Sequence, residues 1–261
     1  MGVKGGGQDG GVVEPLVLLH GFTQTGASWE PVLGALDGQR YRALAPDLPG
    51  HGDASDPAGP VDWASCLQVV GAQAEGAFVL AGYSMGGRLA LRFALEHPER
   101  VSRLVLISTS AGLADADERA RRRQADEELA ERLERDGLEA FVSEWESQAL
   151  FAGQSEVVRA RARARRQGNH AAGLAAALRG VGTGTMIPLW DRLGELHMPV
   201  TVVVGERDTR YRELGQRLIA GLAHGVLVTV AGAGHALALE APEALARAIE
   251  THPDAATGLR R

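Results

Sequence analysis

The sequence around Ser84 is typical of a catalytic nucleophile. Ser84 lies in GYSMG (residues 82–86), after the apolar run FVLA and before the helical pattern GGRLALRFALEHP. A tight turn from strand to helix exposes such a serine, and small residues at 82, 86 and 87 let the two backbones approach closely. The hydroxyl would then lie at a helix N-terminus, where backbone amides favour negative charge. The spacing therefore predicts a reactive serine.

A serine hydroxyl needs a base, and the chain contains eight histidines. We predict that His235 is the base, because a loop from the carboxyl end of the last candidate strand, GVLVTV, can reach back to Ser84. The acid that orients the imidazole is predicted to be Asp208, after PVTVVVGER, with Glu206 and Asp191 as rival carboxylates. Ser84, Asp208 and His235 thus form a candidate catalytic triad.

The segment LLHGF, near the start of the chain, predicts part of an oxyanion hole next to this triad. Backbone N–H groups of Phe22 and of Met85 would form an oxyanion hole beside the nucleophile. We expect His20 to brace this loop by hydrogen bonding, rather than to transfer protons. The segment PDLPGHG (residues 46–52) is interpreted as a rigid architectural loop.

Arginine is the less expected signal. Arg88 lies one helical turn beyond Ser84 and leans to the same side of the helix. Acyl transfer does not require a cation there, whereas an anionic substrate would benefit from one; the alternative for Arg88 is an ion pair within the fold. Other arginines could reach the same crevice or could lie on the surface, namely Arg119, Arg122, Arg123, Arg165 and Arg166.

The spacing of apolar segments predicts the elements that position these residues. Continuous apolar strands separated by helices indicate a parallel sheet covered on both faces, so we predict an α/β fold with a mostly parallel, doubly wound sheet. The six candidate strands are residues 16–19, 42–46, 78–82, 103–108, 199–205 and 225–230, and the helical patterns are residues 28–37, 62–75, 85–97, 209–222 and 241–251.

The segment from Leu113 to Gly194 interrupts this alternation. It contains no strand-like run and predicts about four helices, which would cover the crevice where open α/β sheets bind ligands. We therefore expect one core (residues 1–112 and 195–261) with an all-helical cap insertion (residues 113–194). Within it, residues 159–166 alternate Arg and Ala too quickly to mark one helical face and are interpreted as a solvated helix side.

Composition narrows the classes of function. The net charge of −6 and a pI near 5.8 argue against a nucleic-acid partner. A single cysteine, Cys66, excludes an intrachain disulfide, and nothing resembles a zinc-ligand spacing. Without a signal-peptide core or a run near the roughly 18 apolar residues of a membrane helix, the sequence predicts a cytoplasmic protein, which we expect to be a monomer.

Several motifs resemble known enzymes between residues 16 and about 250. LLHGF, PDLPGHG, GYSMGG, GERD and GAGH resemble the α/β-hydrolase fold. GYSMGGR, ADERARRRQAD, FVSEWESQALF, RRQGNHAAGLAAALRGVGTG and VGERDTRY narrow the resemblance to the 2-succinyl-6-hydroxy-2,4-cyclohexadiene-1-carboxylate synthases of menaquinone biosynthesis. The chain departs from that family at residues 186–187, where Gln and Pro are usual, and at residues 148–150, where a proline is common.

The resemblance implies a carbon–oxygen lyase that needs no metal or organic cofactor. Activated Ser84 would take a proton from 2-succinyl-5-enolpyruvyl-6-hydroxy-3-cyclohexene-1-carboxylate, and the chain of double bonds would expel pyruvate. For this small polycarboxylate the resemblance implies carboxylate binding by Arg88, Arg122 and Arg166, a pocket wall at Trp145, and Tyr83 beside the nucleophile. Two alternatives remain open: a serine hydrolase of a small acidic carboxylic ester, and a ligand-binding protein that has lost turnover.

Overall fold

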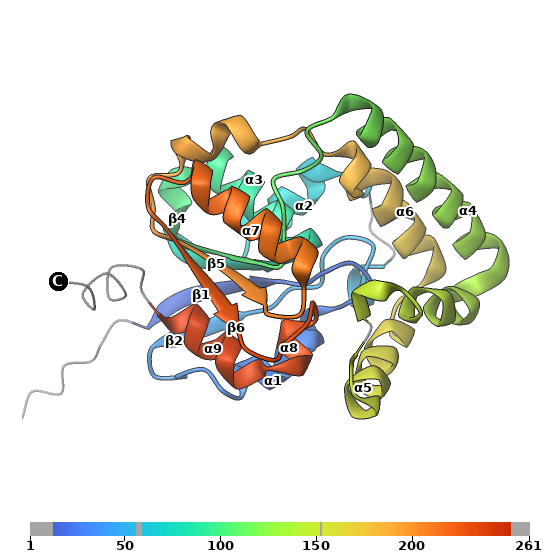
Figure 1. Cartoon of the computed structure of the whole chain (residues 1–261), viewed down its shortest axis with the longest axis horizontal. Coiled ribbons are helices and arrows are strands. Elements are labelled where there is room, and N and C mark those ends of the chain that lie inside the picture. Colours follow the sequence, from blue (N-terminus) through green and yellow to red (C-terminus); the bar gives the residue numbers. More distant parts are fainter. Residues whose placement is uncertain (1–12, 56–58, 152, 252–261) are drawn as a thin grey trace, which may run out of the picture.

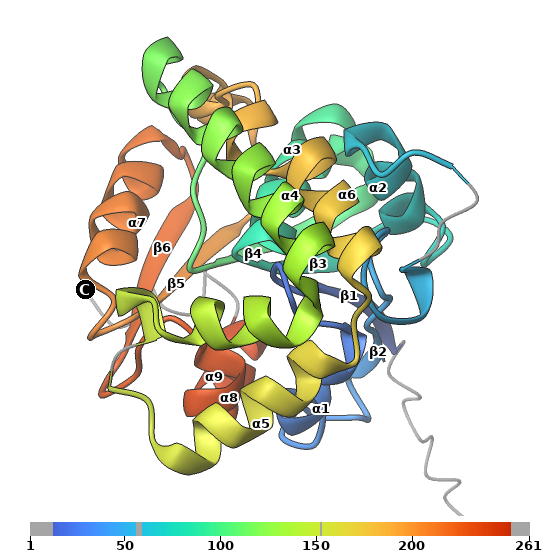
Figure 2. The ribbon, with the colours of Figure 1, turned by 90° about the vertical axis from the view of Figure 1, so that its right-hand side faces the viewer.

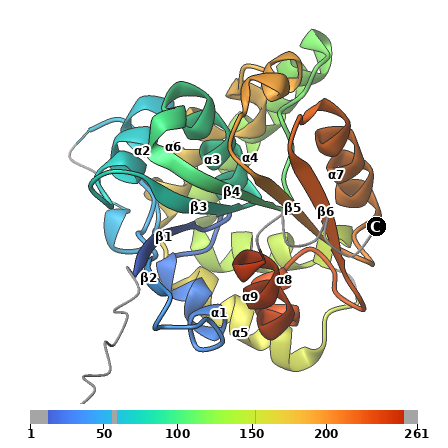
Figure 3. The same cartoon turned by 90° about the vertical axis from the view of Figure 1, so that its left-hand side faces the viewer.

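The computed structural model of the chain describes residues 13–55, 59–151 and 153–251. Within these residues the six predicted strands form one parallel sheet in the order β2-β1-β3-β4-β5-β6, seen in Figures 1 and 3. The strands are β1 (Glu14–Leu19), β2 (Tyr41–Leu44), β3 (Phe78–Tyr83), β4 (Val101–Ile107), β5 (Val200–Gly205) and β6 (Gly225–Val230).

Both faces of the sheet are apolar, because the strands are continuously apolar and successive residues of a strand point to opposite sides. In β1, Leu16 and Leu18 join the core shared with α1, α8 and α9, whereas Val17 and Leu19 join the core shared with α2, α3 and α7. Figure 3 shows these two groups of helices on opposite sides of the sheet. The continuous apolar strands therefore confirm the prediction of a doubly wound sheet.

The helices of these two layers are close to the predicted positions. They are α1 (Glu30–Leu33), α2 (Trp63–Gly71), α3 (Met85–Glu96), α7 (Thr209–Gly221), α8 (Leu237–Glu240) and α9 (Pro242–Glu250), with short 3-10 helices at Gly26–Trp29, Gly52–Ala54 and Pro98–Arg100. The helix predicted over residues 28–37 is the clearest difference, since it begins as a 3-10 turn and its α-helical part ends before Gly34. None of the helices in the described part of the chain has the length and hydropathy to cross a membrane.

The chain between β4 and β5 is helical in its described residues. It contains α4 (Ala116–Glu146), α5 (Glu156–Gln167) and α6 (Ala171–Val181), with 3-10 helices at Ala149–Phe151, Thr183–Thr185 and Trp190–Glu195. Gly137 has φ 83° and ψ 171°, so α4 is two helical segments joined at a kink. Figures 1 and 2 show α4, α5 and α6 together on the side toward which β5 and β6 point.

Strand order explains why residues far apart in sequence meet. All strands run the same way, so their carboxyl ends share one edge of the sheet. Phe22 follows β1, Ser84 follows β3, Asp208 follows β5 and His235 follows β6. Each of these side chains therefore begins at the same edge.

Candidate active site

Ser84 lies in a strained turn between β3 and α3. Its φ of 52° and ψ of −107° are unfavourable for a residue with a side chain. An added Cβ on Gly82 would lie 2.3 Å from the Gly86 carbonyl oxygen, and one on Gly86 would lie 2.3 Å from the Leu19 carbonyl oxygen. The close approach predicted for this turn is therefore present, and only glycine fits at these two positions.

His235 and Asp208 form a buried pair above this turn. His235 Nδ1 donates to Asp208 Oδ2 at 2.6 Å, so Nε2 is the ring nitrogen left to accept a proton. Asp208 is held in place because it caps α7, its Oδ1 accepting from the backbone N–H of Tyr211 at 3.4 Å. Adjacent pairing of β5 and β6 brings the two residues together.

The rival carboxylates lie elsewhere. Glu206 accepts from the backbone N–H of Gly232 at 2.7 Å, and Asp191 is exposed in the 3-10 helix Trp190–Glu195. Among the three candidate acids, Asp208 is thus the one bonded to His235.

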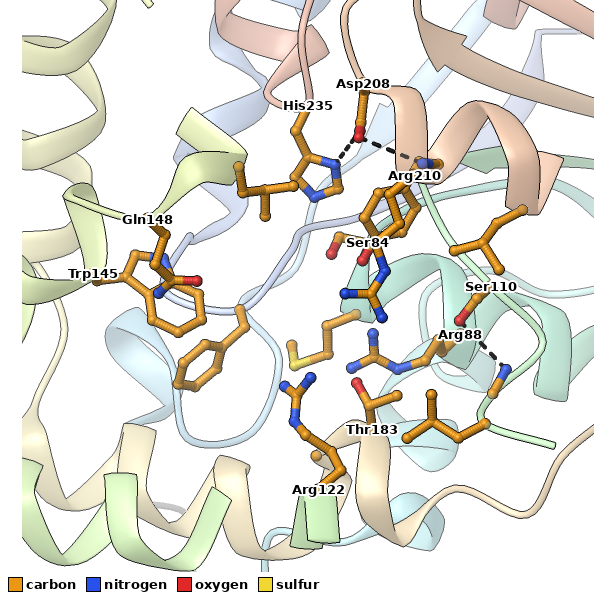
Figure 4. A pocket seen from close by; sticks show the side chains of 18 of the residues that line it. Ser84, Arg88, Ser110, Arg122, Trp145, Gln148, Thr183, Asp208, Arg210 and His235 are labelled. Atoms are coloured by element: carbon orange, nitrogen blue, oxygen red, sulfur yellow. Dashed lines mark hydrogen bonds and ion pairs between the residues drawn. The ribbon is translucent and has the colours of Figure 1, made fainter. Parts of the chain in front are cut away.

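A cavity of about 620 Å³ opens at this edge of the sheet and is lined by Ser84, Asp208 and His235. Figure 4 shows the Ser84 and His235 side chains facing the same space. Phe22 and Met85 also line it, and Met85 is the first residue of α3, where backbone amides lack intrahelical acceptors. The predicted oxyanion-hole residues are therefore beside the serine.

The apolar wall of the cavity includes α6 residues, a tryptophan of α4 and a phenylalanine of the loop after β1. Trp145 stacks on Phe141, with ring centroids 5.5 Å apart, and lies edge-on to Phe22 at 5.2 Å. Trp145 and Phe22 both line the cavity, as the sequence resemblance implied for Trp145. Tyr83, in contrast, is buried against the His235 ring at 5.2 Å and is not among the lining residues that the structure describes.

Arginine dominates the charged lining. Among the described lining residues, four are arginines, and Asp208 is the one acid. The arginines are Arg88, Arg122, Arg207 and Arg210. A small molecule with several negative charges suits this lining.

Arg88 is the most unusual of these cations. Its residue is 7% exposed, and no acceptor for its Nε lies among the described residues, so the alternative of an ion pair within the fold is wrong. Burial lowers the pKa of Arg88 to about 10, which still leaves the guanidinium charged at neutral pH. A buried cation without a carboxylate partner is costly unless a ligand supplies the anion.

Arg122 is the one predicted arginine of α4 that lines the cavity. Its Nε donates to Asp126 Oδ1 at 2.8 Å, and Asp126 is buried. Arg119 donates to the backbone carbonyls of Leu113 and Ala114, and Arg123 donates to that of Gly184. The three arginines that share a helical face therefore have different partners.

Arg166 corrects the expectation that residues 159–166 form a solvated helix side. It is buried rather than solvated, because α5 turns Ala162 and Arg166 inward, while Arg165 pairs with Glu30. Arg166 also does not reach the described cavity lining, since its Nη1 pairs with Glu146 at 3.1 Å and its guanidinium lies 4.8 Å from the centroid of Phe151. Carboxylate binding by Arg166 therefore stays a prediction, and it would require the side chain to leave Glu146.

His20 has the environment of a bracing residue. Its Nε2 accepts from the backbone N–H of Leu48 at 2.9 Å, and its Nδ1 lies 2.9 Å from the Gly21 carbonyl oxygen. Burial lowers the pKa of His20 to about 4 and so keeps the ring neutral. It ties the loop after β1 to residues 46–52, as expected for an architectural segment.

Sequence reasoning missed three residues of this site. Arg207 and Arg210 belong to the same GERDTRY motif as Asp208, and their nearness to it was the available signal. Glu240 accepts from the backbone N–H groups of Gly234, at 2.7 Å, and of Ala236, at 3.2 Å, on either side of the histidine. Nothing in the local pattern around Glu240 marks that contact.

Comparison with known proteins places this chain in a family. The sequence profile of the alpha/beta hydrolase family matches residues 16–248. A Bacillus subtilis (strain 168) protein, provisionally named 2-succinyl-6-hydroxy-2,4-cyclohexadiene-1-carboxylate synthase, is 40% identical over 88% of this chain and 86% of its own length. A synthase of the same name from Pectobacterium atrosepticum is 34% identical over 91% of this chain and 94% of its own.

Solved structures agree on the fold. MenH from S. aureus has a TM-score of 0.85 and 28% identity, with 91% of this chain and 92% of that chain covered. A thermophilic esterase from Thermogutta terrifontis, solved with malate bound, has a TM-score of 0.77 and 26% identity over 92% of this chain and 89% of that one.

Proposed function

Because this chain belongs to the alpha/beta hydrolase family and, within it, to the 2-succinyl-6-hydroxy-2,4-cyclohexadiene-1-carboxylate synthases, we propose that it is a lyase. Its substrate would be 2-succinyl-5-enolpyruvyl-6-hydroxy-3-cyclohexene-1-carboxylate, from which it eliminates pyruvate to form the cyclohexadiene product. The observation that carries this proposal is Arg88, a buried cation one turn from Ser84 that has no carboxylate partner among the residues that the structure describes. An anionic substrate accounts for that cation, whereas hydrolysis of a neutral ester does not.

The names of substrate and product define the bonds that change. The ring proton at C2 is removed, and the electrons of that C–H bond form the C2–C3 double bond. The existing C3–C4 double bond shifts to C4–C5, and the C5–O bond breaks. The enolpyruvate that leaves takes up a proton and becomes pyruvate, so the reaction needs no oxidant or water.

The triad would act here as a base rather than as an acylating group. His235, oriented by Asp208, takes the Ser84 proton, and the activated oxygen removes the proton at C2. That proton is acidic because C2 adjoins the succinyl ketone, whose oxygen becomes negative as the proton leaves. The backbone N–H groups of Phe22 and Met85 would stabilise this oxygen.

We propose that residues 113–194 are an all-helical cap inserted into a core of residues 1–112 and 195–261. Two cavity-lining side chains, Arg122 and Trp145, come from α4, whereas the triad comes from the sheet edge. The separate origin of these two groups of residues supports the proposal of a cap over the core. We also propose that the protein is cytoplasmic and that it is a monomer, since one chain supplies every proposed residue of the site. Size-exclusion chromatography with light scattering measures the mass in solution and tests the monomer.

A second candidate is a serine hydrolase of a small acidic ester. The His235–Asp208 pair and the glycine-walled Ser84 turn favour it, because acyl transfer uses the same groups. The likeness to the Thermogutta terrifontis esterase supports it as well.

The deciding experiment follows pyruvate release. Purified enzyme with the enolpyruvyl substrate is expected to form one pyruvate for each cyclohexadiene product, and Ser84→Ala is expected to abolish both. A folded wild-type protein that hydrolyses esters but releases no pyruvate would replace the lyase with the second candidate.

A further inference from the structure

Arg210 is a cavity-lining cation without a role in the reaction as described so far. It is the second residue of α7, two positions after Asp208, and it is exposed. Figure 4 shows its side chain extending into the cavity toward Arg88. Its guanidinium forms no hydrogen bond or ion pair with any other residue in the described part of the chain.

The two arginines nearest to Arg210 in the sequence differ from it, because other residues bind their guanidinium groups. Arg207 pairs with Glu240 at 2.8 Å and donates to the Gly153 carbonyl oxygen at 3.1 Å. Arg212 donates to the Glu206 carbonyl oxygen at 3.2 Å. Arg210 therefore keeps its donors available to a ligand.

The charges around this space are unbalanced. Arg88 has no ion pair among the described residues, Arg122 pairs with Asp126, and Arg210 has no carboxylate partner there either. Burial of Arg88 makes the repulsion among these guanidinium groups stronger than it would be in water. A ligand with several carboxylates would relieve this repulsion and gain a hydrogen-bonded fork at each site.

The proposed substrate has three carboxylates, which lie on ring carbon C1, at the end of the succinyl chain and on the enolpyruvyl group. Its leaving group must reach solvent without crossing the ring. The enolpyruvyl group should therefore lie nearer to the exposed Arg210 than to the buried Arg88.

Resting on the proposed function, we propose that Arg210 binds the carboxylate of the enolpyruvyl leaving group. The C5–O bond breaks heterolytically, and its electrons pass to the enolpyruvate oxygen beside that carboxylate. A guanidinium there stabilises negative charge that is larger in the transition state than in the bound substrate. Arg210 is thus a substrate-binding residue whose contact also lowers the barrier to elimination.

The test compares wild type, Arg210→Ala, Arg210→Lys and the control Arg212→Ala, which removes the same charge from the same helix away from the cavity. Steady-state kinetics give kcat and KM on the enolpyruvyl substrate and the inhibition constant of added pyruvate. Arg210→Ala is expected to lower kcat/KM by ~10- to 100-fold and to weaken inhibition by pyruvate similarly. The kcat/KM of Arg210→Lys should lie between those of wild type and Arg210→Ala, since lysine keeps the charge but not the two parallel N–H donors of the guanidinium. The kcat/KM of Arg212→Ala should match that of wild type.

Binding without turnover separates this inference from the proposed function. Calorimetry on Ser84→Ala, alone and combined with Arg210→Ala or Arg212→Ala, measures affinity for the intact substrate. If wild type turns the substrate over but Arg210→Ala behaves like Arg212→Ala, the Arg210 inference alone is wrong. If wild type releases no pyruvate and Ser84→Ala does not bind the substrate, the proposed function fails and the inference fails with it. Equal melting temperatures of Arg210→Ala and Arg212→Ala exclude a folding defect. If Arg210→Ala lost as much kcat/KM on a neutral ester as on the enolpyruvyl substrate, Arg210 would have a structural role and the inference would be wrong.

Discussion

Arg88 is buried one turn after Ser84 with no carboxylate partner among the described residues, whereas most buried charges in proteins are paired. Its position is imposed by α3, which must begin at Ser84 for the nucleophile to be exposed. The start of this helix therefore brings the Ser84 hydroxyl and the Arg88 guanidinium to one cavity. At the scale of single residues, this pair is the reason that we propose a lyase with an anionic substrate rather than a hydrolase of neutral esters.

Arg88→Ala is expected to lower kcat/KM on the enolpyruvyl substrate by ~10- to 100-fold, the value of a desolvated charge-assisted hydrogen bond. Hydrolysis of a neutral ester should change little, because no carboxylate is bound. Arg92→Ala is the matched control, since Arg92 lies on the same helix and pairs with Glu96 at 2.7 Å. An equal loss on both substrates would show that Arg88 supports the fold rather than the substrate.

At the scale of elements, Glu240 of α8 joins the histidine loop to the segment that follows α4. Its carboxylate accepts from the backbone amides on both sides of His235. It also accepts from Gln154 Nε2 at 3.2 Å and from Arg207, whose other nitrogen holds the Gly153 carbonyl oxygen. The position of the histidine is thus coupled to the segment that follows α4.

Glu240→Gln is expected to lower kcat more than it raises KM, because an amide N–H₂ would face a backbone donor and shift the loop that carries His235. One unpaired buried donor also costs about 1–3 kcal/mol of stability. Kinetics and thermal unfolding measure the two effects, and Glu243→Gln, an exposed change on α9, is the control. Reduced stability with unchanged kcat well below the melting temperature would contradict a positioning role.

At the scale of the whole molecule, two buried histidines couple stability to pH. His20 and His51 lie with ring centroids 5.0 Å apart between the end of β1 and residues 46–52. Burial lowers the pKa of His20 to about 4 and that of His51 to about 3, against 6.5 for an ordinary histidine. Both rings are therefore neutral in the folded protein over most of the working range.

The unfolded chain takes up more protons than the folded one below pH 6.5, so stability is lost as the pH falls from 6.5 toward 4. The expected slope is about 1.4 kcal/mol per pH unit for each histidine. Urea unfolding of wild type between pH 7 and 5 measures it. His51→Gln should lose about half of the slope, and His197→Gln, an exposed change, should keep it. Titration of the two buried rings above pH 6 in NMR spectra would contradict this.

The sequence alone was enough to predict the sheet and to bring the candidate triad together, because local rules govern both. Short continuous apolar runs that alternate with helical segments favour strands buried on both faces, and parallel strands share one carboxyl edge. The turn at Ser84 is equally local, since the glycines that it needs lie within four residues of the serine. Asp208 and His235 follow adjacent strands, so their pairing required no knowledge of the helices.

The direction of each arginine was decided by tertiary structure. Arg166 turns toward Glu146, twenty residues away, and Arg210 points into the cavity without a described partner. Glu240 binds Gln154, 86 residues away in the chain. Such side chains can reach several partners from one backbone position, and packing of distant helices selects among them. Residue types and spacing determined the chemistry available at the sheet edge, and the fold decided which charges are left for a substrate.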